Sequence, residues 1–126
     1  MIVVVLAPAS PARAQQIDAT VDDESITELD IEQRSKLDQL ATRRTPSCEE
    51  VIDELRKEKL KISEARKAGV EVFNSEVDEF YAAYANRMRL TAEQITEALA
   101  RSGINADTLK HRIRADIAWR KYRQRW

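Results

Sequence analysis

Most of the chain after residue 27 carries apolar residues three or four positions apart, the spacing that gives a helix one apolar face. The clearest stripe lies near the middle of the chain and consists of Val77, Phe80, Tyr81, Tyr84 and Met88. Comparable stripes are Leu29, Gln33, Leu37 and Leu40; Val51, Ile52, Leu55, Leu60, Ile62 and Ala65; and Leu109, Ile113 and Ile117. This pattern predicts a mainly α fold.

Capping signals predict where these helices begin and end. A hydroxyl residue followed three positions later by a side chain that can accept a hydrogen bond is typical of a helix start. Such pairs are Thr27 with Asp30, Ser47 with Glu50, Ser75 with Asp78 and Thr91 with Gln94, and either Asn105 or Asp107 would cap the last helix. Gly69 and Gly103 stand where left-handed helix ends are expected. About five helices follow from these signals, the longest running from Ser47 to Lys67 or Ala68.

A small β-hairpin is expected before the first helix. Two short β-prone runs, residues 17–21 and 25–27, flank the acidic residues 22–24. Chain reversal at the acidic residues would pair the two runs. The predicted architecture is therefore an N-terminal hairpin followed by helices.

The first fourteen residues have the layout of a secretory signal. The apolar run of residues 2–7 is followed by Pro8 and then by Ala12-Arg13-Ala14, a small-x-small cleavage site. A buried strand is the alternative interpretation. The run is much shorter than the ~20 residues of a membrane-spanning helix, so no membrane span is predicted. We expect a signal peptide over residues 1–14 and one exported domain over residues 15–126.

Charge is distributed unevenly along a chain of 126 residues whose formal net charge is −1. Residues 101–126 contain eight Lys or Arg and only two Asp, whereas most acidic residues lie upstream. Cations near the end of a helix are favoured by the helix dipole, and this accounts for the basic end. Contact with nucleic acid or a membrane surface is the alternative. We expect no nucleic-acid partner.

The residues that usually carry enzyme chemistry are scarce. Cys48 is the only cysteine and His111 the only histidine, and no glycine-rich phosphate loop occurs. His111 stands among Lys110, Arg112 and Arg114 and is expected at the surface. No catalytic residue, cofactor or metal site is therefore predicted.

Several segments, taken in order, resemble the N-terminal domain of the SurA family of periplasmic chaperones. The opening Val21-Asp-Asp-Glu-Ser-Ile-Thr27 followed by Asp30-Ile-Glu-Gln-Arg34 is similar to that family's hairpin and first helix. Further matching segments are residues 51–60, 64–72, 75–78, 90–95, 99–104 and 108–119. The resemblance covers residues 17–124, almost the whole chain after the signal.

The resemblance implies a periplasmic chaperone domain. In that family the domain binds unfolded outer-membrane proteins, prefers aromatic-rich segments, and shares a fold with the peptide-binding part of trigger factor. The residues expected to contact such peptides are aromatic or apolar: Phe73, Tyr81, Met88, Trp119 and Tyr122, with Phe80 and Tyr84 as further candidates.

Family members often continue into parvulin-type prolyl isomerase (rotamase) domains and a C-terminal helix that packs on this domain. The chain holds neither, so we expect no enzyme activity; an N-terminal fragment of a prolyl isomerase is the alternative. Without that helix, a stripe of Leu29, Leu37, Ile113 and Ile117 would be partly bare. A homodimer or a helix supplied in trans would then cover it.

Overall fold

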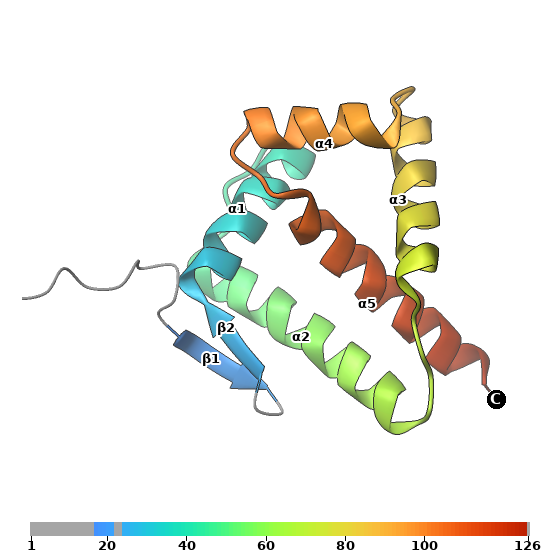
Figure 1. Ribbon diagram of the computed structural model, residues 1–126. Coiled ribbons are helices and arrows are strands. Elements are labelled where there is room, and N and C mark those ends of the chain that lie inside the picture. The colour runs from blue at the N-terminus through green and yellow to red at the C-terminus, as the bar shows by residue number, and fades with distance from the viewer. Residues whose placement is uncertain (1–16, 22–23, 126) are drawn as a thin grey trace, which may run out of the picture.

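A computed structural model describes residues 17–21 and 24–125. Within these residues a hairpin of two strands precedes five helices, which confirms the predicted mainly α fold (Figure 1). The elements in chain order are β1 (Ile17–Val21), β2 (Glu24–Thr27), α1 (Glu28–Thr42), α2 (Cys48–Lys67), α3 (Asn74–Arg87), α4 (Ala92–Arg101) and α5 (Ala106–Gln124). The predicted signal peptide, residues 1–14, lies outside the described residues.

The hairpin is anchored by its second strand. β1 and β2 are antiparallel, with Ala19 opposite Ile26 and a register irregularity between Ile17 and Ala19. The Ile26 side chain is fully buried and packs with Ile31, Val51 and Leu55. The hairpin is therefore fixed against α1 and α2.

Most predicted helix starts are confirmed. The Thr27 hydroxyl accepts from the Asp30 N–H, and the Asp30 carboxylate accepts from the Thr27 N–H. Thr91 and Gln94 make the same reciprocal pair at α4, while Ser47 accepts from the Glu50 N–H at α2. At α5 the cap is Asn105, whose side-chain oxygen accepts from the Asp107 N–H at 2.9 Å. The two glycines, Gly69 and Gly103, have the predicted left-handed φ angles of 79° and 75°.

The predicted start of α3 at Ser75 is wrong. The helix begins at Asn74 with Phe73 as its N-cap, and the Glu76 carboxylate accepts from the Phe73 N–H at 3.0 Å. Lys121 Nζ, on α5, lies 2.6 Å from the same carboxylate. A tertiary contact with the last helix thus supports the observed start.

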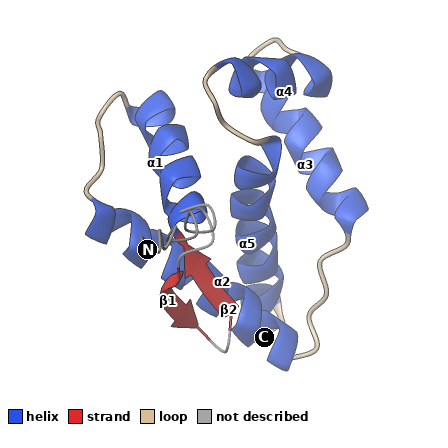
Figure 2. Ribbon diagram, turned by 60° about the vertical axis from the view of Figure 1, so that its left-hand side comes forward, coloured by secondary structure: helices blue, strands red, loops and turns tan. Residues whose placement is uncertain are grey.

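The other four helices are arranged around α5. Helices α2 and α5 pack along each other and run in the same direction, and α1 contacts both (Figure 1). Helices α3 and α4 pack on α5 from its other flank, and the hairpin lies at the α1–α2 side (Figure 2). Helix α5 is therefore the central element against which both halves of the domain pack.

The two halves have different interiors. The larger cluster is apolar and joins α3, α4 and α5 with one residue of α1: Leu37, Val77, Tyr81, Ala85, Ile95, Leu99, Ile104, Leu109, Ile113 and Ile117. The smaller cluster lies under the hairpin and contains Ile26, Ile31, Val51 and Leu55. The buried polar residues Arg34 and Glu58 lie on α1 and α2.

The expected apolar face of α1 is only partly correct. Leu29 and Leu40 are 44% and 53% exposed, and the helix buries Ile31, Arg34 and Leu37. The expectation that Leu37, Ile113 and Ile117 are partly bare is wrong, because all three are buried in the larger cluster. Helices α3 and α4 close this core, so only Leu29 of that predicted stripe is exposed.

Candidate functional site

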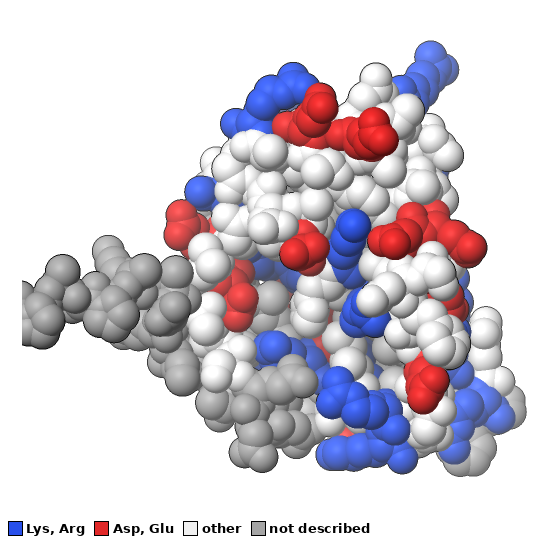
Figure 3. Space-filling view, in the orientation of Figure 1, with Lys and Arg blue, Asp and Glu red and all other residues white. Residues whose placement is uncertain are grey.

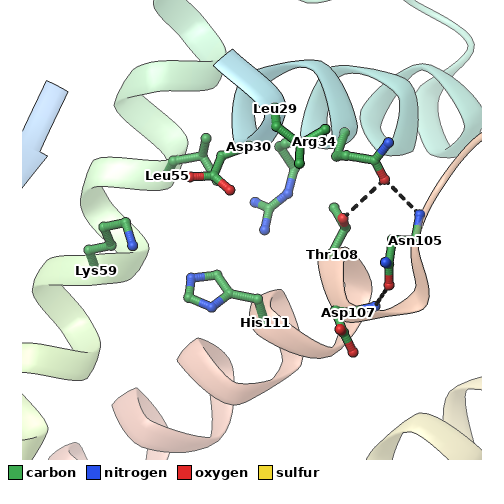
Figure 4. Close-up of a pocket in the computed structure, with 10 residues that line it drawn as sticks. Leu29, Asp30, Arg34, Leu55, Lys59, Asn105, Asp107, Thr108 and His111 are labelled. Atoms are coloured by element: carbon green, nitrogen blue, oxygen red, sulfur yellow. Dashed lines mark hydrogen bonds between the residues drawn. The ribbon is translucent and has the colours of Figure 1, made fainter. Parts of the chain in front are cut away.

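A cleft opens between α1, α2 and α5. It has a volume of about 320 Å³ and mixes apolar, acidic and basic side chains: Leu29, Asp30, Gln33, Arg34, Leu55, Lys59, Asn105, Asp107, Thr108 and His111. Figure 4 shows Arg34 extending from α1 toward His111 on α5, with Lys59 directed inward from α2. Side chains from three helices thus converge on one space, which we call the α1–α2–α5 cleft.

Arg34 is the buried charge of this cleft. Its side chain is 1% exposed, and its two terminal nitrogens lie 2.5 and 2.7 Å from the Glu58 carboxylate oxygens. Its Nη1 also donates to Glu54 at 3.0 Å. Burial opposes the charge, but these two carboxylates raise the pKa of Arg34 above its ordinary value. The guanidinium is therefore held in one orientation by α2.

Sequence reasoning missed this ion pair. Arg34 lies three residues after Ile31 and three before Leu37, and Glu58 lies three after Leu55. Both charged residues thus occupy positions that the apolar periodicity assigns to the buried face. Two opposite charges that interrupt the buried stripes of different helices are the signal that could have found the pair.

A carboxyl pair adjoins the Arg34 network. The Asp38 carboxyl hydrogen-bonds to Glu54, with Arg34 and Arg112 nearby. Partial burial and the Glu54 carboxylate raise the pKa of Asp38 from 3.8 to about 7, although the two arginines oppose the rise. Near pH 7 the Asp38 carboxyl is therefore protonated in part of the molecules, beside Glu54 at the α1–α2 junction.

The expectation that His111 is a surface residue is wrong. Its side chain is half-buried in the cleft, and burial lowers the pKa of His111 below 6.5, with Lys59 and Arg34 acting in the same direction. The cleft therefore favours the neutral form of the imidazole. The surrounding basic residues suggested exposure, but this face of α5 packs toward α1 and α2.

Gln33 holds the start of α5 at the edge of the cleft. Its amide nitrogen donates to the Gly103 carbonyl at 2.9 Å, and its amide oxygen accepts from the Asn105 N–H at 2.6 Å. The Thr108 hydroxyl lies 3.4 Å from the same oxygen (Figure 4). One side chain of α1 thereby fixes the loop between α4 and α5.

A second hollow, of about 420 Å³, adjoins the cleft on the α3 side of α5. It is lined by Asn74, Val77, Asp78, Asp107, Lys110, His111 and Arg114, and thus shares Asp107 and His111 with the first. Lys110 lies 3.4 Å from the Asp78 carboxylate, and Arg114 donates to the Val72 carbonyl and to Asn74. The two hollows meet across the first turns of α5.

The structure distributes the five predicted peptide-binding residues over several places. Phe73 and Met88 are exposed but cap opposite ends of α3, about 20 Å apart at 1.5 Å per residue. Tyr81 is buried, and its hydroxyl lies 2.6 Å from that of Thr96. Trp119 and Tyr122 stack on α5, with ring centroids 5.2 Å apart.

Phe73 and the stacked pair also lie on different sides of α5. Lys121 Nζ is 5.6 Å from the centroid of the Phe73 ring. Because Lys121 follows Trp119 by two residues, the two side chains leave the helix on nearly opposite sides. The five residues therefore do not form one continuous surface.

Among the described residues, no group of three or more His, Cys, Asp or Glu side chains is placed to hold a metal ion. Within the same part of the chain, no helix is long and apolar enough to cross a membrane. What the site does offer is a pair of open hollows with fixed polar groups and one exposed leucine.

Comparison with known proteins identifies the family. The family model described as the SurA N-terminal domain matches residues 14–123. No curated protein matches the chain. The match covers both strands and nearly all of α5, in agreement with the hairpin-plus-helices architecture. The chain belongs to the SurA N-terminal domain family.

Proposed function

We propose that this chain is a periplasmic chaperone domain that binds unfolded, aromatic-rich segments of outer-membrane proteins and assists their transit and folding. The observation that carries the proposal is the family match over residues 14–123. Supporting it, the domain exposes large apolar side chains that a client could cover, among them Leu29, Leu60, Phe73 and Met88. Such a chaperone only has to bind and release its client, and its function requires no catalytic step.

The expected affinity is modest. Covering one exposed leucine or phenylalanine contributes about 1–2 kcal/mol at roughly 25 cal/mol per Å² of apolar area. Several such contacts must first offset the cost of ordering a flexible client. A dissociation constant on the order of micromolar follows, which suits a chaperone that must release its client.

Aggregation of a denatured outer-membrane protein tests the proposal. The client is diluted from urea in the presence of the purified chain, and turbidity is followed over time. We expect slower aggregation at equimolar chain, and none of this effect with an equal mass of lysozyme. Unchanged turbidity over a large molar excess of the chain would contradict the proposed function.

Export is a separate part of the proposal. The sequence of residues 1–14 supports cleavage after Ala14, because Ala12 and Ala14 suit the small-residue pockets of a signal peptidase. N-terminal sequencing of the protein from a periplasmic fraction should begin at Gln15. Recovery of chains beginning at Met1 from the cytoplasm would argue against export.

The alternative is an N-terminal part of a prolyl isomerase. The family found is the SurA N-terminal domain, and no parvulin domain is found in the chain. We therefore expect no acceleration of cis–trans exchange in a proline peptide by the purified chain. Catalysis that persists through repeated purification would favour the isomerase alternative.

A further inference from the structure

The two hollows adjoin each other at the first turns of α5, and we call them together the path across α5. The α1–α2–α5 cleft and the hollow on the α3 side share Asp107 and His111, and each opens to solvent. Together they cross the first turns of α5 from one half of the domain to the other. Two adjoining open hollows suit an extended chain better than a compact small molecule, because a small-molecule pocket buries most of its ligand.

Charge along this path is balanced. The cleft contains Arg34 and Lys59 against Asp30 and Asp107, and the second hollow contains Lys110 and Arg114 against Asp78 and the shared Asp107. Figure 3 shows the molecule from the side seen in Figure 1. Acidic and basic side chains are interleaved over the middle of the face in view, whereas basic side chains gather at its lower edge. Because neither sign dominates, the path favours a polar but uncharged group over an ion.

One buried donor in the cleft lacks an acceptor. Arg34 Nε has no hydrogen-bond partner among the described residues, although both terminal nitrogens of the same guanidinium are bound to carboxylates. A buried N–H without an acceptor is destabilising, and an incoming acceptor removes that penalty. Because the atom is shielded, side chains at the cleft must shift when an acceptor approaches.

The apolar part of the cleft lies beside this donor. Leu55 is buried at the cleft, and Leu29 is exposed at its edge (Figure 4). A ligand that places a carbonyl oxygen near Arg34 would therefore meet an apolar wall at the same time. A polypeptide in extended conformation presents this combination, since main-chain carbonyls alternate with side chains along it.

We propose that an extended segment of an unfolded client lies across α5 in these two hollows, with a main-chain carbonyl accepting from Arg34 Nε–H and an apolar side chain packed against Leu29. The inference rests on the proposed chaperone function and adds the location and the mode of recognition. Main-chain recognition is independent of sequence, which suits a site that accepts many clients.

Two measurements with one probe test the inference. The probe is a blocked, uncharged peptide of about twelve residues with alternating aromatic and polar positions. First, the Nε–H resonance of Arg34 is followed by NMR in the unaltered chain, because substituting a buried ion-pair residue could unfold it. We expect this resonance to move with peptide concentration in step with overall binding.

Second, the peptide's dissociation constant is compared between Leu29→Ala and a matched control, Leu40→Ala. Both leucines are exposed on α1, but Leu40 lines neither hollow. We expect Leu29→Ala to weaken binding about fivefold, from the apolar contact area lost. The control should remain within about twofold of the unaltered chain.

The outcomes separate the two proposals. Peptide binding with an unmoved Arg34 resonance, or with equal effects of the two leucine variants, would overturn this inference and leave the chaperone function intact. A peptide that fails to bind the unaltered chain, together with unchanged client aggregation, would remove both. A moving resonance with selective loss in Leu29→Ala supports the placement.

Discussion

The two halves of this domain are closed by different means. On the α3–α4 side of α5, the buried side chains are apolar apart from the Tyr81 hydroxyl. On the α1–α2 side, a small apolar cluster is supplemented by the ion pair of Arg34 and Glu58 and by the carboxyl pair of Asp38 and Glu54.

The difference matters for where binding is expected. An apolar core is tightly packed and leaves little for a partner to satisfy. A buried polar network is sensitive to each missing hydrogen bond and leaves Arg34 Nε unpaired beside an open cleft. The α1–α2 side, which we call the polar half, is thus the less self-sufficient half and contributes the cleft with the unpaired donor.

Breaking the ion pair should have the largest effect on stability. Arg34→Ala leaves the buried Glu58 without its partner, and we expect a loss of about 3–5 kcal/mol in the free energy of unfolding. Urea denaturation followed by circular dichroism measures it. As a control, Lys57→Ala removes an exposed ion pair with Asp53 and should cost less than about 0.5 kcal/mol.

A double variant tests whether the charges of Arg34 and Glu58 themselves stabilise the polar half. Replacing Arg34 by Met and Glu58 by Leu together leaves neither of these two charges buried, so we expect stability within about 1 kcal/mol of the unaltered chain. A loss as large as that of Arg34→Ala would show that the pair stabilises the domain well beyond apolar packing.

A cavity should destabilise the α3–α4 side of the domain, which we call the apolar half. Leu99 is buried in the larger cluster, so Leu99→Ala removes apolar contacts and leaves a void. We expect a loss of about 3 kcal/mol by the same denaturation measurement. A loss below about 1 kcal/mol would indicate that this core relaxes around the void and is packed less tightly than the structure suggests.

The carboxyl pair makes the polar half pH-dependent. Because the pKa of Asp38 is about 7 in the folded chain and near 3.8 when unfolded, the folded state binds more protons between these values. Stability therefore falls as pH rises from about 4 to about 7. We expect Asp38→Asn to raise stability at pH 8 by about 1–2 kcal/mol, after allowance for solvent screening.

Denaturation midpoints of both forms at pH 5 and pH 8 measure this effect. The gain from Asp38→Asn should be clearly larger at pH 8, where the unaltered chain must ionise a disfavoured carboxyl. His111 opposes the trend in both forms equally, since its lowered pKa costs stability as pH falls below 6.5. An equal gain at both pH values would argue against a raised pKa of Asp38 in the folded chain.

The smallest expected loss of stability comes from removing the Tyr81 hydroxyl, the buried polar group of the apolar half. The Thr96 hydroxyl donates to the Ala92 carbonyl, so the Tyr81 hydroxyl is the donor in their 2.6 Å contact. Tyr81→Phe should cost about 1 kcal/mol. Tyr84→Phe, at a half-buried position of the same helix, is the control and should be nearly neutral.

Local features of this fold could be predicted from the sequence. The caps at Thr27, Ser47 and Thr91 and the left-handed glycines depend on residues only a few positions apart, so their signals are complete within a short window. The hairpin and the number of helices followed from the same kind of signal. The start of α3 was misplaced because Glu76 is held in part by Lys121, 45 residues away.

The candidate site could not be predicted in the same way. Arg34 and Glu58 are 24 residues apart, and either alone could have been an exposed residue of a charged helix. His111 was placed at the surface because its neighbours in sequence are basic, whereas its environment is set by α1 and α2. Which side of a helix is buried depends on the helices that pack against it. The periodicity of α1 alone predicts Leu29 and Leu40 on the buried side, although both are exposed.

The Gln33 contacts carry a consequence for the order of folding. They join residues separated by 70 to 75 positions, with three helices between them. Closing a flexible loop of that length costs about 4 kcal/mol of chain entropy, more than the roughly 2–3 kcal/mol that two or three hydrogen bonds return on average. The first helix should therefore dock on the start of the last one only after the intervening helices have shortened that loop, late on the folding pathway.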